Sequence, residues 1–330
     1  MKERLIWADA LKGLLMILVI IGHAIQTVEQ ETCETNHLWN IIYSFHMPAF
    51  MAVSGWLAYR GQSPLMGGGK SLILRRFRQL MIPYFVWSFI MFLLIENKLF
   101  SKIFLYPDNF FWFLWALFFI NVIFIANQMI AKKVEVNDMP IHMVVCCVLS
   151  GIMVLLNLRM FGFQYIAYYF MFYILGYTIH RYDMIRYING MAAIVMFLAW
   201  GVMAWFWNMH DLPSWLLGIP YIPQSIILFA YRAVTATIAI VLLLKVSPYV
   251  FDNKRSYIVS SCASFGLLSL GIYAVHLLLA DMTNEYIEIK LFDKNSKEVL
   301  LAISLIALSY FVVKLISMHK ILSKLMLGKY

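Results

Sequence analysis

Ionisable side chains within long apolar stretches are costly unless they have a partner or a function. The candidates for a function in this sequence are Asp9, Lys12, His23, His46, Arg232 and His276. An imidazole is well suited to remove a hydroxyl proton near neutral pH, because histidine titrates near pH 6.5. Lone histidines within a membrane also commonly bridge two helices by a hydrogen bond. The histidines therefore indicate either a general base or a set of helix contacts.

The spacing around these side chains predicts no metal centre. Zinc needs three or four protein ligands, and no second histidine or carboxylate lies one helical turn from His23, His46 or His276. The four cysteines show neither metal nor disulfide spacing. Asp9 and Lys12 are three residues apart on one helical face, so they form either an internal ion pair or part of a catalytic site.

Arginines predict an anion site at one membrane face. Arg75 and Arg78 are three residues apart on one helical face at the start of an apolar stretch. Guanidinium pairs suit the phosphates of a nucleotide-bearing donor, whereas basic residues at a membrane face also anchor topology or contact lipid headgroups. Arg232 lies about a third of the way into its apolar stretch, so it is expected to pair across a helix bundle or to bind an anion.

Membrane-spanning helices are the elements that must position these side chains. Hydrophobic residues make up 63% of the chain and charged residues 13%, and the apolar stretches repeatedly reach the ~20 residues that cross a bilayer core. We predict an all-α polytopic transmembrane bundle of about ten spans, formed by one integral membrane domain over residues 1–330. The expected spans are 8–27, 38–60, 77–95, 110–130, 141–157, 163–181, 190–208, 224–246, 258–280 and 299–318.

The basic residues predict how these spans are oriented, because positively charged loops stay in the cytoplasm. Of the 26 lysines and arginines, Arg232 lies within a span, 19 fall on the inner side and six on the outer side when the N-terminus is inside. Both termini are therefore expected in the cytoplasm. The outer loops 28–37, 208–223 and 281–298 suit either a polar acceptor or plain solvent. Because the net charge of +9 is spread over short loops, no nucleic-acid partner is expected.

The three histidines are expected at similar depths near the outer side. At 1.5 Å of rise per residue, His23 is about 27 Å from Leu5, and His276 is about as far from Ile258. His46 enters the second span from outside by about 12 Å. The histidines are therefore predicted to line one polar pocket.

Short motifs follow one another along the chain. They are, in chain order, W-x-D-x-x-K-G with I-I-G-H ending at His23, I-Y-S-F-H-M-P-A-F with S-G-W, R-R-F-R with P-Y, F-W-F-L, and L-G-I-Y-A-V-H from Leu270 to His276. These motifs resemble those of the acyltransferase 3 family of integral membrane acyltransferases, and more narrowly its fucose 4-O-acetylase-like branch. Their order, spacing and membrane context together make the resemblance specific, and it covers most of the chain.

The resemblance implies an O-acyltransferase of the bacterial inner membrane. Acyl-CoA (acetyl-CoA) would be the donor, as a co-substrate rather than a permanently bound cofactor, and a carbohydrate or cell-envelope glycan beyond the membrane would be the acceptor. The lipid bilayer is the remaining partner, and the oligomeric state is left open.

The resemblance also assigns roles to single residues. The first-span histidine of the family corresponds to His23 as the catalytic residue, and its arginine pair corresponds to Arg75 and Arg78 as the donor-binding residues. Lys12 stands where the family commonly has arginine, and a lysine lacks the planar fork for bidentate anion recognition. The other pocket candidates are His46, His276, Arg232, Asp9, Lys12 and Tyr273.

The alternative function is a small-molecule or lipid-linked substrate transporter or flippase, in which the intramembrane histidines and Arg232 bind substrate or relay protons. The sequence shows no internal repeat of the transporter type. The paired arginines at the inner face also favour the acyltransferase.

Overall fold

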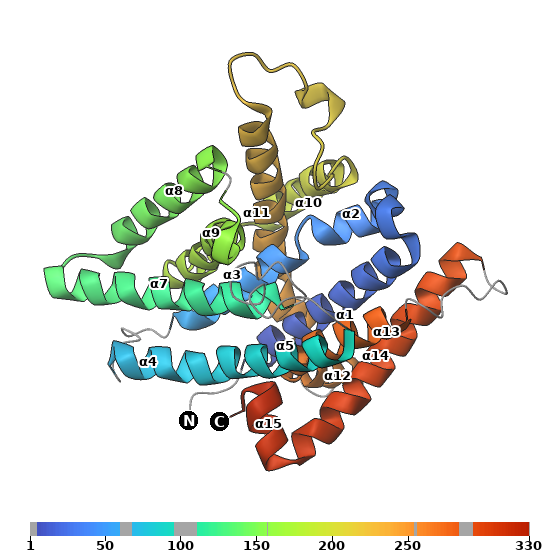
Figure 1. The fold of residues 1–330 in the computed structure, drawn as a ribbon. Helices are drawn as coiled ribbons and strands as arrows, with labels where there is room; N and C mark the ends of the chain where they lie inside the picture. The colour runs from blue at the N-terminus through green and yellow to red at the C-terminus, as the bar shows by residue number, and fades with distance from the viewer. Residues whose placement is uncertain are drawn as a thin grey trace. The chain divides into compact units, whose positions relative to one another are not determined.

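The computed structural model describes residues 5–59, 68–95, 111–156, 158–253, 256–283 and 293–329, and these residues form helices without a strand (Figure 1). The predicted all-α fold class is therefore confirmed. Part of the loop 281–298 lies outside the described residues, as do several basic residues used to predict the orientation. The latter are Lys2, Arg4, Arg60, Lys98, Lys102, Lys254, Arg255 and Lys290.

The chain divides into two compact units, each with its own set of packed helices. Unit 1 is Met1–Val53 with Asp183–Lys314, and unit 2 is Ser54–Tyr182 with Leu315–Tyr330. The prediction of a single domain stays a prediction.

Unit 1 contains the helices on which the histidines lie. In chain order they are α1 (Ile6–Glu29), η1 (Gln30–Thr35), α2 (His37–Tyr43), the first part of α3 (His46–Ala58), η5 (Met184–Tyr187), α10 (Gly190–Trp205), η6 (Ser214–Leu216), α11 (Gln224–Val250), α12 (Tyr257–Leu267), α13 (Ser269–Thr283) and most of α14 (Lys294–Met318).

Unit 2 contains the arginine pair. Its helices are the end of α3, α4 (Gly69–Arg76), the π-helical turn η3 (Phe77–Met81), α5 (Ile82–Ile95), α7 (Trp112–Val134), α8 (Asp138–Leu156), η4 (Met160–Gly162), α9 (Phe163–Arg181), the end of α14, and α15 (Lys320–Leu327).

Helix α1 is the central packing element of unit 1, where it contacts α2, α11, α12 and α13. Its contact with α12 is so close that glycine is needed on both helices. A Cβ atom on Gly13 would lie 2.0 Å from the backbone oxygen of Cys262, and one on Gly266 would lie 1.8 Å from that of Asp9. Small residues permit such close approach of membrane helices. The continuous, tightly packed α1 is thus a rigid support for His23.

A polar network joins α7, α8 and α9 in unit 2. The Asp138 carboxylate accepts hydrogen bonds from Tyr177 and Arg181, and Nε2 of His142 lies 3.5 Å from it. His142 is fully buried, and the Asn127 amide nitrogen lies 3.2 Å from its Nδ1. Hydrogen bonds between buried polar groups compensate for the loss of hydration, so this network stabilises the packing of the three helices.

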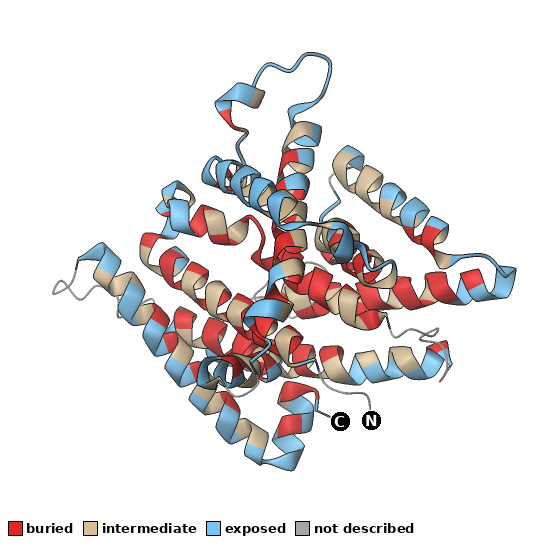
Figure 2. Ribbon diagram, turned by 180° about the vertical axis from the view of Figure 1, so that it is seen from behind, coloured by how far each residue is buried: buried red, intermediate tan, exposed pale blue. Residues whose placement is uncertain are grey.

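Exposed residues lie along several helices (pale blue in Figure 2), and many of them are large and apolar. Examples are Leu155 on α8, Phe197 on α10 and Phe311 on α14, which are 78%, 58% and 60% exposed. So much exposed apolar surface is unusual in a soluble protein, whereas a bilayer accommodates it. The chain is a multi-pass membrane protein.

Seven helical segments are long and apolar enough to cross a membrane within the described part of the chain, or eight if the bent pair α12–α13 is one span. The seven match the predicted spans 8–27, 38–60, 77–95, 110–130, 141–157, 224–246 and 299–318. The two other predicted spans, 163–181 and 190–208, correspond to α9 and to α10, which has 16 residues. Helices thus form at all ten predicted places, and the count of ten spans stays a prediction.

The predicted span 258–280 is not one straight helix. Helices α12 and α13 meet at an angle of 76° around Leu268. The depth of His276 that was calculated along a straight helix from Ile258 is therefore wrong. Helix α13 nevertheless packs against α1, so His276 still lies beside the first span.

An ion pair and a hydrogen bond join three segments that were predicted on the outer side. Lys294 lies 2.8 Å from the Glu29 carboxylate, and Nδ1 of His210 lies 2.8 Å from the Glu34 carboxylate. The end of α1, the segment after α10 and the start of α14 therefore lie on one side of the bundle formed by unit 1. This agrees with the predicted alternation of the spans.

Candidate functional site

His23, His46 and His276 converge in unit 1, although they come from three different helices. The ring centroids of His23 on α1 and His276 on α13 are 5.3 Å apart. The Tyr43 ring from α2 lies 6.4 Å from the His23 ring and 4.7 Å from the ring of His46, the first residue of α3. Tyr43 thus connects His23 with His46.

Hydrogen bonds fix the tautomers of two of these histidines. Nδ1 of His46 lies 2.7 Å from the carbonyl oxygen of Ile42, and Nδ1 of His276 lies 2.8 Å from that of Ile272. A carbonyl oxygen only accepts, so Nδ1 must carry the proton in each ring. In the neutral form, Nε2 of both histidines is therefore a hydrogen-bond acceptor and a potential base.

His23 has a polar neighbour that the sequence reasoning missed. Gln26, one helical turn further along α1, is a side-chain hydrogen-bond partner of His23. The Tyr43 hydroxyl donates to Oε1 of Gln26 at 2.9 Å. Gln26 therefore orients the His23 ring and is itself held by Tyr43. Only the i, i+3 spacing on one helical face could have indicated Gln26 from the sequence.

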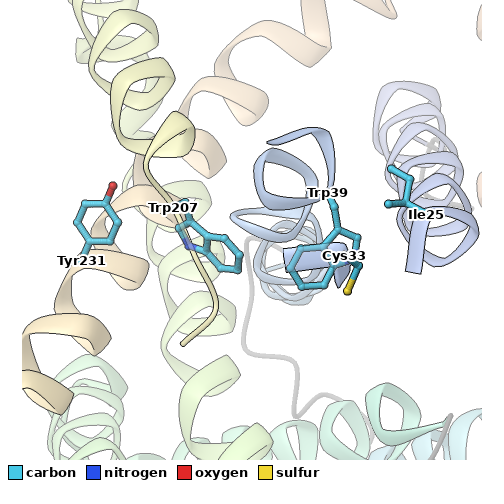
Figure 3. Close-up of a cluster of buried hydrophobic side chains, with 5 residues drawn as sticks. All are labelled: Ile25, Cys33, Trp39, Trp207 and Tyr231. Carbon is cyan, nitrogen blue, oxygen red and sulfur yellow. The ribbon is translucent and has the colours of Figure 1, made fainter. Parts of the chain in front are cut away.

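Packed aromatic side chains hold Tyr43 in place. Its ring stacks on Trp39 with centroids 3.9 Å apart. Trp39 belongs to the buried cluster drawn in Figure 3, together with Ile25, Cys33, Trp207 and Tyr231. Rings locked by packing hold an adjacent polar group at a defined position. The cluster thus positions Tyr43 against Gln26, His23 and His46.

Asp9 and Lys12 do not join the histidines. Lys12 Nζ lies 2.7 Å from the Asp9 carboxylate, so the two residues form the ion pair that was one of their two interpretations. Asp9 and His23 are fourteen residues apart on the continuous helix α1, which is about 21 Å at 1.5 Å per residue. A direct role for Asp9 in orienting His23 is thus excluded by distance.

Arg232 and Tyr273 have neighbours within unit 1. Arg232 on α11 donates to the carbonyl oxygen of Met209 at 3.2 Å, and its guanidinium lies 5.6 Å from the centroid of the Trp207 ring. The expected pairing across the bundle is therefore made with a carbonyl and an aromatic ring. Tyr273 is buried on α13, and its ring centroid lies 6.0 Å from that of His276.

The arginine pair belongs to unit 2. Arg75 lies in the last turn of α4, and Arg78 lies in the π-helical turn η3. Both are exposed, and the structure shows no hydrogen bond or ion pair from either one to another described residue. Arg76, between them, instead donates to the side chain of Gln79 at 3.3 Å. Arg75 and Arg78 are thus the two members of the run that remain available for an anion, and π-helical turns often occur at functional sites.

Within the described ranges, no three side chains of histidine, cysteine, aspartate or glutamate are arranged to hold a metal ion. What the site in unit 1 offers is imidazole chemistry. Two rings present Nε2 as an acceptor, and a third ring, His23, is oriented by Gln26. Such a group can take a proton from a hydroxyl and return it to a leaving group.

The amino-acid sequence matches a known family along almost its whole length. The profile of the Acyltransferase domain family, Acyl_transf_3, matches residues 5–318. The chain therefore belongs to the acyltransferase 3 family, and the resemblance seen in the motifs is confirmed.

Two curated relatives are also similar. The chain is 32% identical to Nodulation protein NolL of Sinorhizobium fredii (strain NBRC 101917 / NGR234) over 152 residues, which are 40% of this chain and 39% of the relative. It is 27% identical to Nodulation protein NolL of Mesorhizobium japonicum (strain LMG 29417 / CECT 9101 / MAFF 303099) over 234 residues, or 62% of this chain and 59% of the relative. The chain thus spans about two to three fifths of the length of these relatives. No solved structure matches it.

Proposed function

We propose that this protein is a membrane O-acyltransferase that transfers an acetyl or similar acyl group from acyl-CoA to a hydroxyl of a carbohydrate. The observation that carries the proposal is the arrangement around His23: an imidazole on a membrane helix, oriented by Gln26 and flanked by His276 and Tyr43. Membership of the acyltransferase 3 family supports the reaction class.

In the proposed reaction, His23 is the general base. One nitrogen of its neutral ring takes the proton of the acceptor hydroxyl while the hydroxyl oxygen attacks the thioester carbon. The new C–O bond forms, the C–S bond breaks, and the CoA thiolate leaves. The thiolate then takes the proton from the imidazolium, which restores neutral His23. Gln26 keeps the ring in one orientation throughout.

The donor is proposed to bind through Arg75 and Arg78. Their exposed guanidinium groups match the phosphates at the nucleotide end of CoA. These arginines are proposed to lie at the cytoplasmic face, from which the long pantetheine arm can extend into the membrane and carry the thioester. Neither the nucleotide nor the free acyl group then has to cross the bilayer.

The acceptor is proposed to be a cell-envelope glycan on the outer side of the bacterial inner membrane, with both termini of the protein in the cytoplasm. The contacts Glu29–Lys294 and Glu34–His210 support a common side for the three loops that would face this acceptor. The excess of basic residues in the other loops supports their placement in the cytoplasm.

Reporter fusions should show this topology. A reporter that is active only outside the cytoplasm should be active when it is inserted in loop 281–298 and inactive when it is fused at the C-terminus, because the lysines near the C-terminus resist translocation. A reporter at a second outer position, loop 208–223, is the internal control. Activity at the C-terminus with silence in both loops would reverse the proposed orientation.

A transfer assay tests the function itself. Purified protein is incubated with acetyl-CoA labelled in the acetyl group and with a panel of cell-envelope glycans. We expect label on one class of glycan as an alkali-labile ester, together with release of an equal amount of CoA. Transport of a sugar or lipid-linked sugar into vesicles without any ester formation would instead support the transporter or flippase.

A further inference from the structure

His276 has a buried acceptor atom that the proposed reaction does not use. The side chain is fully buried, and Nδ1 donates to the Ile272 carbonyl oxygen. Nε2 is also buried, and no group in the described part of the chain donates a hydrogen bond to it. A buried polar atom without a partner is rare in folded proteins and requires an explanation. Because Nε2 is the acceptor of the neutral ring, the group that it lacks is a donor.

The neighbours of His276 define what kind of donor fits. The His23 ring lies 5.3 Å away, and the proposed reaction places the acceptor hydroxyl at that ring. His46 is buried in the same manner as His276, with Nδ1 bonded to a carbonyl and Nε2 as the acceptor. In the described part of the chain, none of these three rings forms a hydrogen bond or ion pair with a carboxylate. A site with several neutral acceptors favours hydroxyl groups, because a phosphate or carboxylate offers no donor and an ammonium group would lack a counter-charge.

We propose that Nε2 of His276 accepts a hydrogen bond from a second hydroxyl of the acceptor, adjacent to the hydroxyl that His23 deprotonates. The acceptor class would then be a sugar with two neighbouring free hydroxyls. This inference rests on the proposed function, since it requires that His23 meets the acceptor. In this role His276 binds and aligns the sugar but exchanges no proton in the reaction.

The first test compares paired acceptors. Methyl glycosides of the common envelope hexoses are each assayed beside the monodeoxy analogue that lacks the hydroxyl next to the acylated position. Wild-type protein should prefer the diol over the deoxy sugar by about 10–100-fold in kcat/KM, because the deoxy sugar leaves Nε2 unpaired. His276→Phe should reduce this preference to less than about threefold. A preference ratio does not depend on the fraction of protein that is folded, so partial misfolding of the variant does not affect it.

Two control variants accompany His276→Phe. His276→Gln keeps an acceptor oxygen and should retain part of the preference. His319→Phe removes an exposed histidine that precedes α15, outside both the cluster and the proposed acceptor-facing loops, and should retain all of it. If His276→Phe discriminates between the two sugars as strongly as the wild type does, the inference is overturned.

A binding measurement tests the same inference in variants that have no transfer activity. Saturation-transfer NMR on the detergent-solubilised protein compares cis-1,2-cyclohexanediol with cyclohexanol. The diol should bind more tightly to the wild type, and His276→Phe should bind both alcohols alike. Equal binding of both alcohols to the wild type would overturn the inference. Failure of the proposed function gives a different result, because no glycoside would then be acylated while the diol preference in binding could persist.

Discussion

A His23→Gln variant is expected to insert normally and bind acyl-CoA normally, yet to transfer acyl groups about 10²–10⁴-fold more slowly than the wild type. Glutamine keeps a hydrogen-bonding side chain of comparable reach but cannot take up a proton at neutral pH. The stability lost with one membrane hydrogen bond is only about 0.6–2 kcal/mol. The variant should therefore lose the chemistry and keep the fold.

The measurement is acetyl transfer by purified protein, with His46→Gln and His276→Gln alongside. Wild-type transfer should rise with pH as the imidazole loses its proton, whereas residual transfer by His23→Gln should show no such dependence. Near-normal turnover in His23→Gln would refute the general base at this position. A selective loss in one of the other variants would move the base there.

A Gln26→Leu variant is expected to lose less activity than His23→Gln. It removes the partner that orients His23 while the base itself remains. One hydrogen bond contributes about 1 kcal/mol, so kcat should fall only about fivefold with KM for the donor unchanged. A structural role alone would lower the amount of folded protein instead, and titration of the active fraction separates these two effects.

The sequence alone identified the histidines of the site because ionisable groups are conspicuous in apolar stretches. His23, His46 and His276 could be selected by their cost in a membrane, and the rise per residue placed them at similar depths. Gln26 and Tyr43 gave no such signal, because uncharged polar and aromatic residues are common near the ends of membrane helices. Tyr43 reaches Gln26 and His23 because α2 packs against α1, and the sequence alone does not show this contact between the two helices.

The break between α12 and α13 was beyond prediction from hydropathy. The stretch around Leu268 is predominantly apolar, and no proline marks the bend. Gly266 and Ser269 flank it, and glycine and serine pairs are one known cause of helix kinks. The same glycine is also required for close contact with α1. Hydropathy thus located the span, while packing against α1 determined its shape.

The spacing of an ideal α-helix also gave only part of the geometry of Arg75 and Arg78. The i, i+3 relation of Arg75 and Arg78 assumes a continuous α-helix, but the chain changes to a π-helical turn at Phe77. A π-helix has hydrogen bonds from residue i to i+5 and therefore more residues in each turn. The angle between the two arginines around the helix axis is accordingly wider than predicted, which suits two separated phosphate groups better than one.

The double variant Arg75→Gln, Arg78→Gln is expected to bind acetyl-CoA up to about 100-fold more weakly. Charge-assisted hydrogen bonds contribute about 1.5–3 kcal/mol each, and solvent exposure of both arginines places them at the lower end, or about tenfold each. Acetyl-pantetheine lacks the nucleotide and its phosphates, so its use as a donor should be unaffected by the two substitutions.

Arg76→Gln is the matched control for this variant. It removes one positive charge from the same segment, as does each single substitution Arg75→Gln or Arg78→Gln. Arg76 is engaged with Gln79 rather than available for an anion, so donor binding by Arg76→Gln should remain close to that of the wild type. Equal weakening by the single substitutions Arg75→Gln, Arg76→Gln and Arg78→Gln, abolished by moderate salt, would indicate a diffuse electrostatic effect. If the double variant binds acetyl-CoA with unchanged affinity, Arg75 and Arg78 serve only to orient the protein in the membrane. Selective loss with acetyl-CoA, and none with acetyl-pantetheine, would identify these arginines as contacts for the donor phosphates.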